Sequence, residues 1–379
     1  PDADSQDQGT KRGDPVYRAR NLVYGEDPTR ASMLFVTSTI LALVATVGVF
    51  LTIPGLALLP LGGFLFLMAV GWVTYQAETA RLLTLIATVS TVVIVAFITV
   101  FLFVSALPAF RENGLELLTI PEGRWFFSLE AVLPTSGSPF NPDAGSFSLI
   151  PQIWATIVVT IIAGAVAGPF GLLGALFISE IAGARLRTII KPGVEILAGI
   201  PSIVYGFIGF TILNGFVRDA FLDEGASFLI AGLVGGVMAL PTVVSVAEDA
   251  LSAVPDSMGD GSVAVGATKW QTMKSISVPA AFSGISAAVI LGLGRAIGET
   301  MAVAAILSAG VGLADPLFDP FASSATLTGF IATSYGDASA SLLDVLFVAG
   351  VMLFTIVAAM SVISQYIEKQ VRSNLQGEA

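Results

Sequence analysis

Two charged residues stand four positions apart inside the apolar stretch 281–308: Arg295 and Glu299. If this stretch is one helix, the spacing puts both side chains on one face, and a rise of about 1.5 Å per residue puts them near the middle of a bilayer. A guanidinium donates two parallel hydrogen bonds to an anion that carries several oxygens, and a nearby carboxylate would weaken that hold so that the anion can leave. Charges at this depth are functional candidates because they are costly to bury. The alternative is a structural ion pair that joins this helix to a neighbour.

A polar segment, residues 254–279, interrupts the apolar sequence. Gly266 and Ala267 within it are typical of a tight turn, and Lys269 and Trp270 follow that turn. We expect a short amphipathic helix between two membrane spans, which offers a soluble partner something to push on. The alternative is a helix that is merely solvated at the membrane surface.

Several kinds of catalysis are excluded by residues that the chain lacks. It has no histidine and no cysteine, which removes Ser-His-Asp and Cys-His nucleophiles and zinc sites built on imidazole or thiolate. The nucleotide-binding pattern Gly-x-x-x-x-Gly-Lys-Ser/Thr does not occur either. Asp260 lies in the polar segment and Asp344 at the end of an apolar stretch, so no pair of aspartates lies within spans. We therefore expect no enzymatic activity, no metal site and no nucleic-acid partner, with any ATP hydrolysis on another chain.

The composition is that of a polytopic helical membrane protein, because 55% of the 379 residues are hydrophobic and only 12% are charged. A membrane-spanning helix needs about 20 mostly apolar residues. Eight stretches meet this requirement and predict an all-α fold with about eight transmembrane helices. They are 33–53, 57–75, 83–106, 153–179, 193–215, 227–247, 281–308 and 343–366. Only Pro54-Gly55 separates the first two, which predicts a tight transmembrane hairpin over 31–76.

The basic residues predict the orientation, because cytoplasmic loops collect Lys and Arg. With both termini inside the cell, 13 of the 17 basic residues fall in inside segments, three fall outside and Arg295 lies within a span. The opposite orientation would reverse this bias. We therefore expect a multi-pass protein of the cell membrane, surrounded by lipid, with cytoplasmic N- and C-termini.

The spans divide the chain into segments. They are a disordered cytoplasmic tail over 1–30, the hairpin, the span 83–106, an extracellular loop over 107–152, a core over 153–366 with a cytoplasmic loop over 248–280, and a cytoplasmic tail over 367–379. Pro201 and Pro241 lie inside or near the ends of spans, where proline permits a bend. Both are candidate hinges, and ordinary kinks are the alternative. The net charge of −11 suits the hydrated surface of a protein from a high-salt host, or else reflects drift in composition.

Several motifs resemble those of ABC importer permeases. Their cytoplasmic pattern is Glu-Ala-Ala, three residues, Gly, nine residues, then Ile-x-Leu-Pro. This chain keeps the spacing with Asp260-Gly261-Ser262, three residues, Gly266, nine residues, then Ile276-Ser-Val-Pro279. Three blocks resemble the phosphate-specific branch of these MetI-like permeases: Leu197-Ala-Gly-Ile-Pro-Ser-Ile-Val-Tyr-Gly206, Gly266-Ala-Thr-Lys-Trp-Gln-Thr272 and Gly292-Leu-Gly-Arg-Ala-Ile-Gly-Glu-Thr-Met-Ala-Val303. The Met-Ala-Val that ends the last block is similar to the PstC-type subunit.

The resemblance implies partners and site residues. It implies a MetI-like core that imports inorganic phosphate together with a second, PstA-type permease, two copies of a soluble ATPase that holds ATP and Mg²⁺, and an external phosphate-binding protein. Arg295, Glu299 and Thr300 would line the translocation path. The residues that would dock on the ATPase are Asp260, Gly261, Ser262, Gly266, Ala267, Lys269, Trp270 and Pro279. The alternatives are a permease for another oxyanion such as molybdate or sulfate, a membrane enzyme, and a signalling scaffold that transports nothing.

Overall fold

The computed structural model describes residues 15–24, 28–120, 124–125, 140–141, 146–221, 226–264, 266–307, 310–314 and 316–376. The chain forms two compact units, residues 1–100 and 101–379. The boundary falls inside one long helix, α5 (Gln76–Asn113). Each unit is described by itself.

The first unit contains the predicted hairpin. Helix α3 (Arg30–Thr52) is capped by the Thr29 hydroxyl, and a short turn, η1 (Pro54–Leu56), leads into α4 (Leu58–Thr74). The two helices and the start of α5 enclose a small core of Phe35, Val36, Met68 and Leu82. The break at Pro54-Gly55 is therefore confirmed.

The predicted N-terminal tail is not entirely without structure. Helix α2 (Pro15–Tyr24) lies inside the range 1–30 and packs against α3. Val23 and Tyr24 join the hairpin core, and the Tyr24 hydroxyl lies 3.2 Å from that of Thr37. These contacts give the segment a helix that its polar composition did not predict, while residues 1–14 lie outside the described residues.

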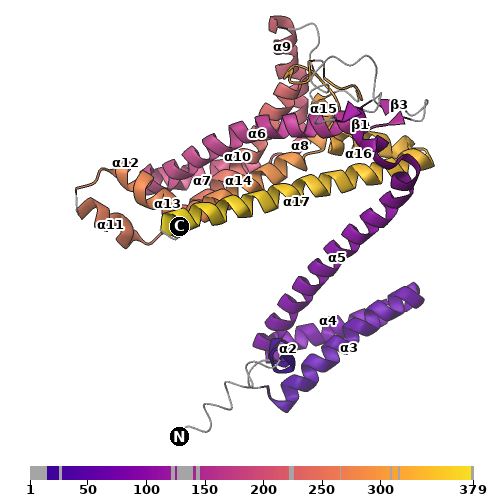
Figure 1. Cartoon of the computed structure of the whole chain (residues 1–379). Coiled ribbons are helices and arrows are strands. Elements are labelled where there is room, and N and C mark those ends of the chain that lie inside the picture. Colours follow the sequence, from indigo (N-terminus) through magenta and orange to yellow (C-terminus); the bar gives the residue numbers. More distant parts are fainter. Residues whose placement is uncertain are drawn as a thin grey trace. The chain divides into compact units, whose positions relative to one another are not determined.

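The second unit is a bundle of long helices. Helix α6 (Ile150–Leu176), which ends in the π-helical turn η5 (Phe177–Ile181), packs against α10 (Phe228–Ser252) and α14 (Phe282–Ile297), and α17 (Ala340–Gln376) lies along α14 (Figure 1). The contact surfaces are rich in alanine: Ala163, Ala167, Ala175, Ala239, Ala247 and Ala288 are all buried. Small side chains let helix backbones approach closely, and the resulting van der Waals contacts help to hold helices together in lipid.

One predicted span, 193–215, is sharply bent. Helix α7 (Ala184–Gly199) is followed by α8 (Ser202–Ile208), the π-helical turn η6 (Gly209–Leu213) and α9 (Asn214–Phe221), and the two halves meet at 85°. Ile200 and Pro201 are both extended, with ψ of 129° and 134°. The prediction of one continuous span is wrong here because a residue before proline is pushed out of the helical region.

The predicted span 281–308 is also discontinuous. Helix α14 ends at Ile297, and a separate helix, α15 (Met301–Ile306), begins after a gap of three residues. Before α14, the segment Lys269–Ala280 meets Phe282–Ile297 at 74°. The unit thus combines straight spans with broken ones, and irregular backbone at membrane depth is tolerated only inside protein or along a cavity.

The remaining elements extend the ends of the bundle. After α5 the described residues form η2 (Gly114–Leu118) and two pairs of short strands, β1 (Thr119–Ile120) with β2 (Arg124–Trp125), and β3 (Phe140–Asn141) with β4 (Ser146–Phe147). Helix α16 (Leu327–Ser334) and η8 (Tyr335–Asp337) precede α17. The polar segment holds α11 (Asp256–Ala264), α12 (Lys269–Thr272), η7 (Met273–Ser277) and α13 (Val278–Ala280).

Six helices of the described chain are long and apolar enough to cross a membrane, or eight if each bent pair counts as one span. The all-α polytopic class is confirmed. Several helix ends differ from the prediction. Helix α5 continues to Asn113 into the predicted loop, α10 continues to Ser252 into the predicted cytoplasmic loop, and α17 continues to Gln376 through most of the predicted tail. The sequence 367–376 consists largely of residues with good helix propensity, such as Glu, Lys, Gln and Arg.

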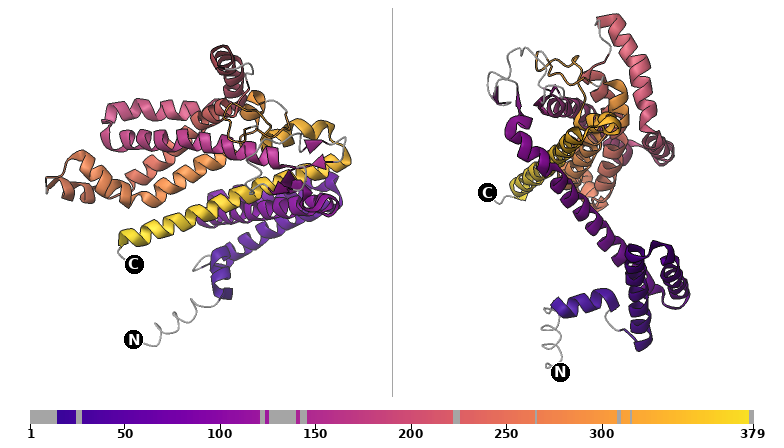
Figure 2. Two further views of the ribbon diagram at one scale, coloured as in Figure 1. Left: turned by 45° about the horizontal axis from the view of Figure 1, so that its top comes forward. Right: turned by 90° about the vertical axis from the view of Figure 1, so that its right-hand side faces the viewer.

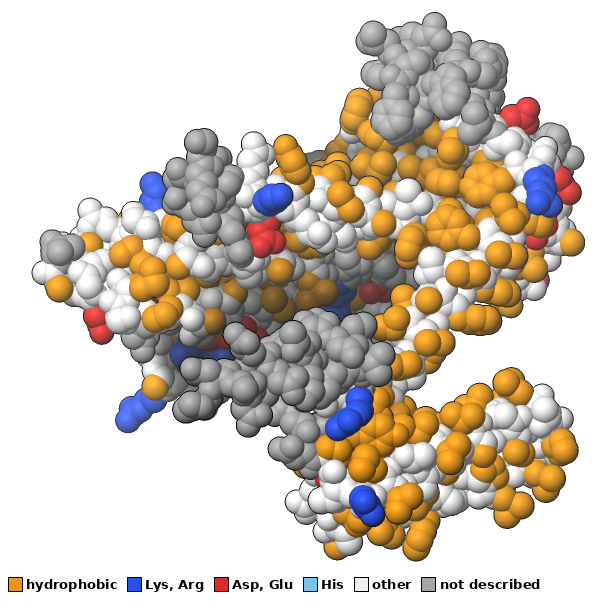
Figure 3. Space-filling model, turned by 60° about the horizontal axis from the view of Figure 1, so that its bottom comes forward, with side chains coloured by type: hydrophobic (Ala, Val, Ile, Leu, Met, Phe, Trp, Pro, Cys, Tyr) orange, Lys and Arg blue, Asp and Glu red, His pale blue; other side chains and the backbone are white. Residues whose placement is uncertain are grey.

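The surface agrees with a membrane setting. In the turned views of Figure 2, α17, in yellow, runs along the bundle of the second unit. Apolar side chains cover much of the face shown in Figure 3, and charged side chains are scattered on it. Exposed apolar patches of this extent are rare on soluble proteins, whereas lipid covers them in a membrane.

Candidate functional site

The structure separates Arg295 from Glu299. Arg295 lies in the last turn of α14, whereas Glu299 lies beyond the end of that helix, in the gap that Gly298 opens. Within the described residues the two side chains form no ion pair. The prediction that both occupy one helical face is therefore wrong, because the helix ends before it reaches the second charge.

Glu299 is bound to the start of α15. Its Oε1 accepts a hydrogen bond of 3.2 Å from the backbone N–H of Ala302, and its carbonyl accepts one of 3.0 Å from the Thr328 hydroxyl. The first N–H groups of a helix have no partner within the helix, and a carboxylate there is favoured by the helix dipole. Glu299 thus caps α15, and Thr328 attaches the gap to α16. The Thr300 hydroxyl bonds the Gly298 carbonyl at 3.2 Å.

Arg295 faces open space. It lines a cavity of about 660 Å³ between α10, α14 and α17, and the other lining residues include Thr242, Ser361, Gln365 and Glu368. Within the part of the chain that the structure describes, its guanidinium has no hydrogen-bond partner. The five donors of the guanidinium fork are therefore available to an anion or a partner.

Helix α15 is also held from the other side. Gly206 of α8 lies so close to it that an added Cβ would be 2.7 Å from the Cα of Ala302. The side-chain amide of Asn214 donates to the Ile306 carbonyl at 3.3 Å. The bent span and α15 therefore form one closely packed contact beside the gap that carries Glu299.

The polar segment is a helix–turn–helix. Gly266 has a φ of 87°, a conformation that favours glycine, and the Ala267 N–H closes the turn on the Ser262 carbonyl at 3.1 Å. The Ser262 and Thr272 hydroxyls, both buried, lie 2.6 Å apart and join α11 to the helix after the turn. The tight turn predicted at Gly266-Ala267 is confirmed.

Several residues of the segment point outward. Trp270 is 62% exposed, an unusual position for a tryptophan, and Lys269, Asp260 and Gly261 are also exposed. Pro279 lies in the short helix α13, which leads into α14 at the end of the segment. The segment therefore presents the Trp270 indole and the charged side chains of Asp260 and Lys269 at its surface, on two helices that the Ser262–Thr272 contact joins.

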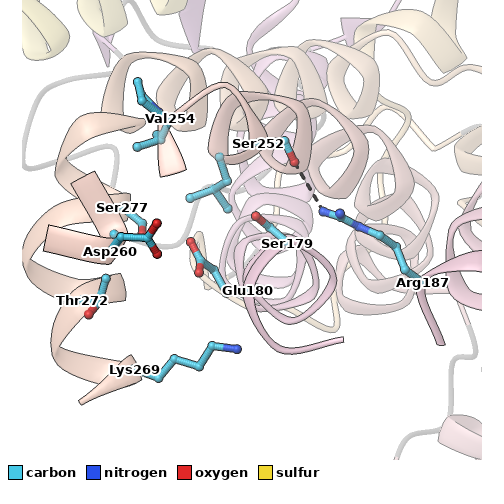
Figure 4. A pocket seen from close by; sticks show the side chains of 12 residues that line it. Ser179, Glu180, Arg187, Ser252, Val254, Asp260, Lys269, Thr272 and Ser277 are labelled. Carbon is cyan, nitrogen blue, oxygen red and sulfur yellow. Dashed lines mark hydrogen bonds between the residues drawn. The ribbon is translucent and has the colours of Figure 1, made fainter. Parts of the chain in front are cut away.

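A cavity of about 480 Å³ lies between the polar segment and the ends of α6, α7 and α10. Figure 4 shows the side chains of Glu180, Asp260 and Lys269 beside it, with Arg187 on the opposite side. Hydroxyls of Ser179, Ser252, Thr272 and Ser277 complete its polar lining. The segment is thus separated from α7 by a polar space.

Sequence reasoning missed one charged residue, Glu248 of α10. Its side chain is only 3% exposed and forms ion pairs with Arg187 at 2.8 Å and Lys191 at 2.6 Å. The signal was present, because Glu248 shares the helical face of the buried residues Val244 and Leu251. The predicted span 227–247 ended one residue too early to include it.

The two candidate hinges lie in different settings. Pro201 stands at the 85° bend between α7 and α8, whereas Pro241 is buried within α10, which continues through it. That either proline moves during function stays a prediction. Among the described residues no group of His, Cys, Asp or Glu could hold a metal ion.

Comparison with known proteins places the chain in a family. The profile of the family described as "Binding-protein-dependent transport system inner membrane component" matches residues 167–373. The probable ABC transporter permease protein YqgH of Bacillus subtilis is 37% identical over 240 residues, which cover 63% of this chain and 73% of the relative. The phosphate transport system permease protein PstC of Xylella fastidiosa is 32% identical over 291 residues, which cover 72% of this chain and 86% of the relative.

A solved structure supports the fold. A chain of a bacterial alginate ABC transporter, crystallised with its pentasaccharide-bound periplasmic protein, superposes with a TM-score of 0.51 at 15% identity, over 79% of this chain and 98% of that one. The resemblance to ABC importer permeases seen in the sequence motifs is confirmed. The chain is a multi-pass membrane protein and belongs to the family of inner membrane components of binding-protein-dependent transport systems.

Proposed function

We propose that this chain is the PstC-type permease subunit of an ATP-driven importer of inorganic phosphate. The observation that carries the proposal is its similarity, over 72% of its length, to a permease named for phosphate transport. A fold shared by many importers does not decide the substrate. The site must therefore be tested for phosphate against other oxyanions.

Arg295 is the residue that we assign to the translocation path. It supplies a permanent positive charge and a planar fork that matches two phosphate oxygens, and it faces a large cavity without a competing partner among the described residues. We assign Glu299 and Thr300 to the same path because they form the gap directly after the helix that carries Arg295, although neither residue lines the Arg295 cavity. Among the described residues Glu299 holds the start of α15 in place and forms no ion pair with Arg295, while the carboxylate of Glu368 lines the Arg295 cavity.

The polar segment is the surface that we assign to the ATPase. Asp260, Gly261, Ser262, Gly266, Ala267, Lys269, Trp270 and Pro279 belong to this rigid helix–turn–helix, which a partner can displace as one body. ATP and Mg²⁺ bind to a dimer of that separate ATPase, which hydrolyses the ATP. The other partners are a PstA-type permease and an external phosphate-binding protein, and both termini of this chain lie in the cytoplasm.

The test is uptake of labelled phosphate into proteoliposomes that hold the chain with its ATPase, its second permease and its binding protein. Arg295→Ala is compared with Arg185→Ala, because Arg185 is an exposed arginine of α7 that does not line the Arg295 cavity. We expect ATP-dependent uptake in the wild type and in Arg185→Ala, and its loss in Arg295→Ala at equal assembly.

Three results would contradict parts of the proposal. Uptake unchanged in Arg295→Ala would return that residue to a structural role. Competition by sulfate or molybdate as strong as by unlabelled phosphate would identify a different oxyanion importer. A folded wild-type complex that takes up no phosphate would refute the proposed substrate.

A further inference from the structure

The Glu248 carboxylate connects two helices near the polar segment. It accepts from Arg187 and Lys191 of α7 at 2.8 and 2.6 Å, and from the Ser252 hydroxyl of its own helix at 3.1 Å. The carboxylate is almost completely buried, whereas the two cationic side chains are 37% and 43% exposed. The cations therefore reach from the surface to a fixed internal anion.

Stability alone does not explain this cluster. Removing a carboxylate from water is costly, and an apolar residue of similar size often serves equally well at such a place. Buried ion pairs can instead specify one arrangement among several. Helix α7, all of whose residues are described, has none that is buried, and apolar residues such as Ile190 and Val194 are only partly covered. Apolar packing therefore holds it only weakly on α10, and the two ion pairs supply the specific contacts.

The position of α7 matters to the polar segment. Arg187 and Ser252 line the same cavity of about 480 Å³ as Asp260 and Lys269 (Figure 4). A segment displaced inward by a partner would close this space and meet α7. Helix α7 can transmit that displacement only if it is held firmly.

The far end of α7 leads to the gap that carries Glu299. After the bend at Pro201, Gly206 of α8 touches the backbone of Ala302, and the N–H of Ala302 is bound by Glu299. Close-packed contacts of this kind transmit strain because they cannot be compressed. The bent span therefore joins the neighbourhood of the polar segment to that of the gap.

We propose that Glu248 is a positioning residue of the transport cycle, which holds α7 on α10 so that movement of the polar segment reaches α15. This inference rests on the proposed function for its transport readout. It predicts that loss of the Glu248 charge uncouples ATP hydrolysis from phosphate uptake. The complex should still assemble, because Arg187 and Lys191 can then be hydrated at the surface.

The first measurement is phosphate taken up per ATP hydrolysed by the complete complex in proteoliposomes. Glu248→Gln should lower this ratio about tenfold, because the loss of one partner of a buried ion pair shifts the equilibrium between the held and the released α7 by at least that factor. Glu248→Asp keeps the charge and should retain most of the ratio. The matched control is Asp249→Asn, which removes a carboxylate at the next, exposed position of α10. An unchanged ratio in Glu248→Gln would overturn the proposal.

The second measurement does not depend on the substrate. The chain has no cysteine, so nitroxides can be placed at Ile189→Cys on α7 and Val237→Cys on α10, both exposed positions, in a complex with cysteine-free partners. Their distance distribution should broaden in Glu248→Gln and stay narrow in Asp249→Asn. A narrow distribution in Glu248→Gln would refute the clamp.

The two measurements separate the two proposals. A wild type without phosphate uptake would refute the proposed substrate, while the distance distribution would still test the clamp. If Glu248→Gln does not assemble, Arg187→Gln carries both measurements, because it removes a partly exposed partner instead of the buried one. Wild-type values of ratio and distance in that variant would overturn the proposal.

Discussion

Replacing Gly206 by alanine tests the contact between α8 and α15. The new Cβ would lie 2.7 Å from the Cα and 2.9 Å from the carbonyl oxygen of Ala302, and 3.0 Å from the Cβ of Ala305. Carbon atoms pack best at about 3.5–4.0 Å. Two of these three atoms belong to the backbone and cannot rotate away, so α8 and α15 must separate by about 1 Å.

The cost follows from two opposing effects. Overpacking of this kind costs roughly 1–3 kcal/mol, and alanine regains up to about 1 kcal/mol as a better helix former than glycine. The net loss, between about 0 and 3 kcal/mol, leaves a folded complex. The hydrogen bond from Ala302 to Glu299 is already 3.2 Å long, however, and a shift of about 1 Å would break it.

Uptake and thermal unfolding of the assembled complex measure both effects. Gly206→Ala should lower the unfolding temperature and reduce phosphate uptake by about tenfold or more, since a misplacement of 1 Å near a site is enough for such losses. The control is Gly215→Ala in α9, where no atom lies within 4 Å of the added Cβ. That variant should match or slightly exceed the wild type. Equal behaviour of the two variants would refute the close contact.

Three further substitutions test separate features. Gly266→Pro cannot keep a φ of 87° because proline holds φ near −65°; the chain should reach the membrane while ATP hydrolysis no longer drives uptake, and normal coupled uptake would contradict this. Glu299→Gln keeps the oxygen acceptor but loses its charge, so thermal unfolding should show a loss of about 1 kcal/mol; no loss would speak against the cap. Thr156→Val leaves the buried N–H of Leu327, which now donates to Thr156 at 2.9 Å, without a partner. The free energy of unfolding should fall by about 1–3 kcal/mol, and an unchanged midpoint of thermal unfolding would disprove that bond.

The membrane-spanning helices and the turn of the polar segment could be predicted from the sequence. Apolar stretches of about 20 residues identify membrane helices because the bilayer thickness sets their length, and six described helices satisfy that test without counting the bent pairs. Gly266 marked the turn of the polar segment because only glycine adopts its φ at no steric cost. These features depend on local composition or on single residues.

Helix breaks and charge partners were decided by the tertiary structure. The sequence alone set Arg295 and Glu299 four residues apart, but whether they share a helix depends on where α14 ends. Beyond that end, Glu299 is held locally by the N–H of Ala302 and from elsewhere in the fold by the Thr328 hydroxyl of α16. Hydropathy averages over about 20 residues and cannot resolve a gap of three.

Glu248 shows the same division most plainly. Its place on an apolar helix face follows from the helical period, but the predicted span 227–247 ended before Glu248, so its burial was found only in the structure. Its partners, Arg187 and Lys191, lie about sixty residues earlier in the chain, on helix α7, which meets the following helical segment at 85°. Charges in a low-dielectric interior must be paired, but which charges meet is decided only when the helices pack.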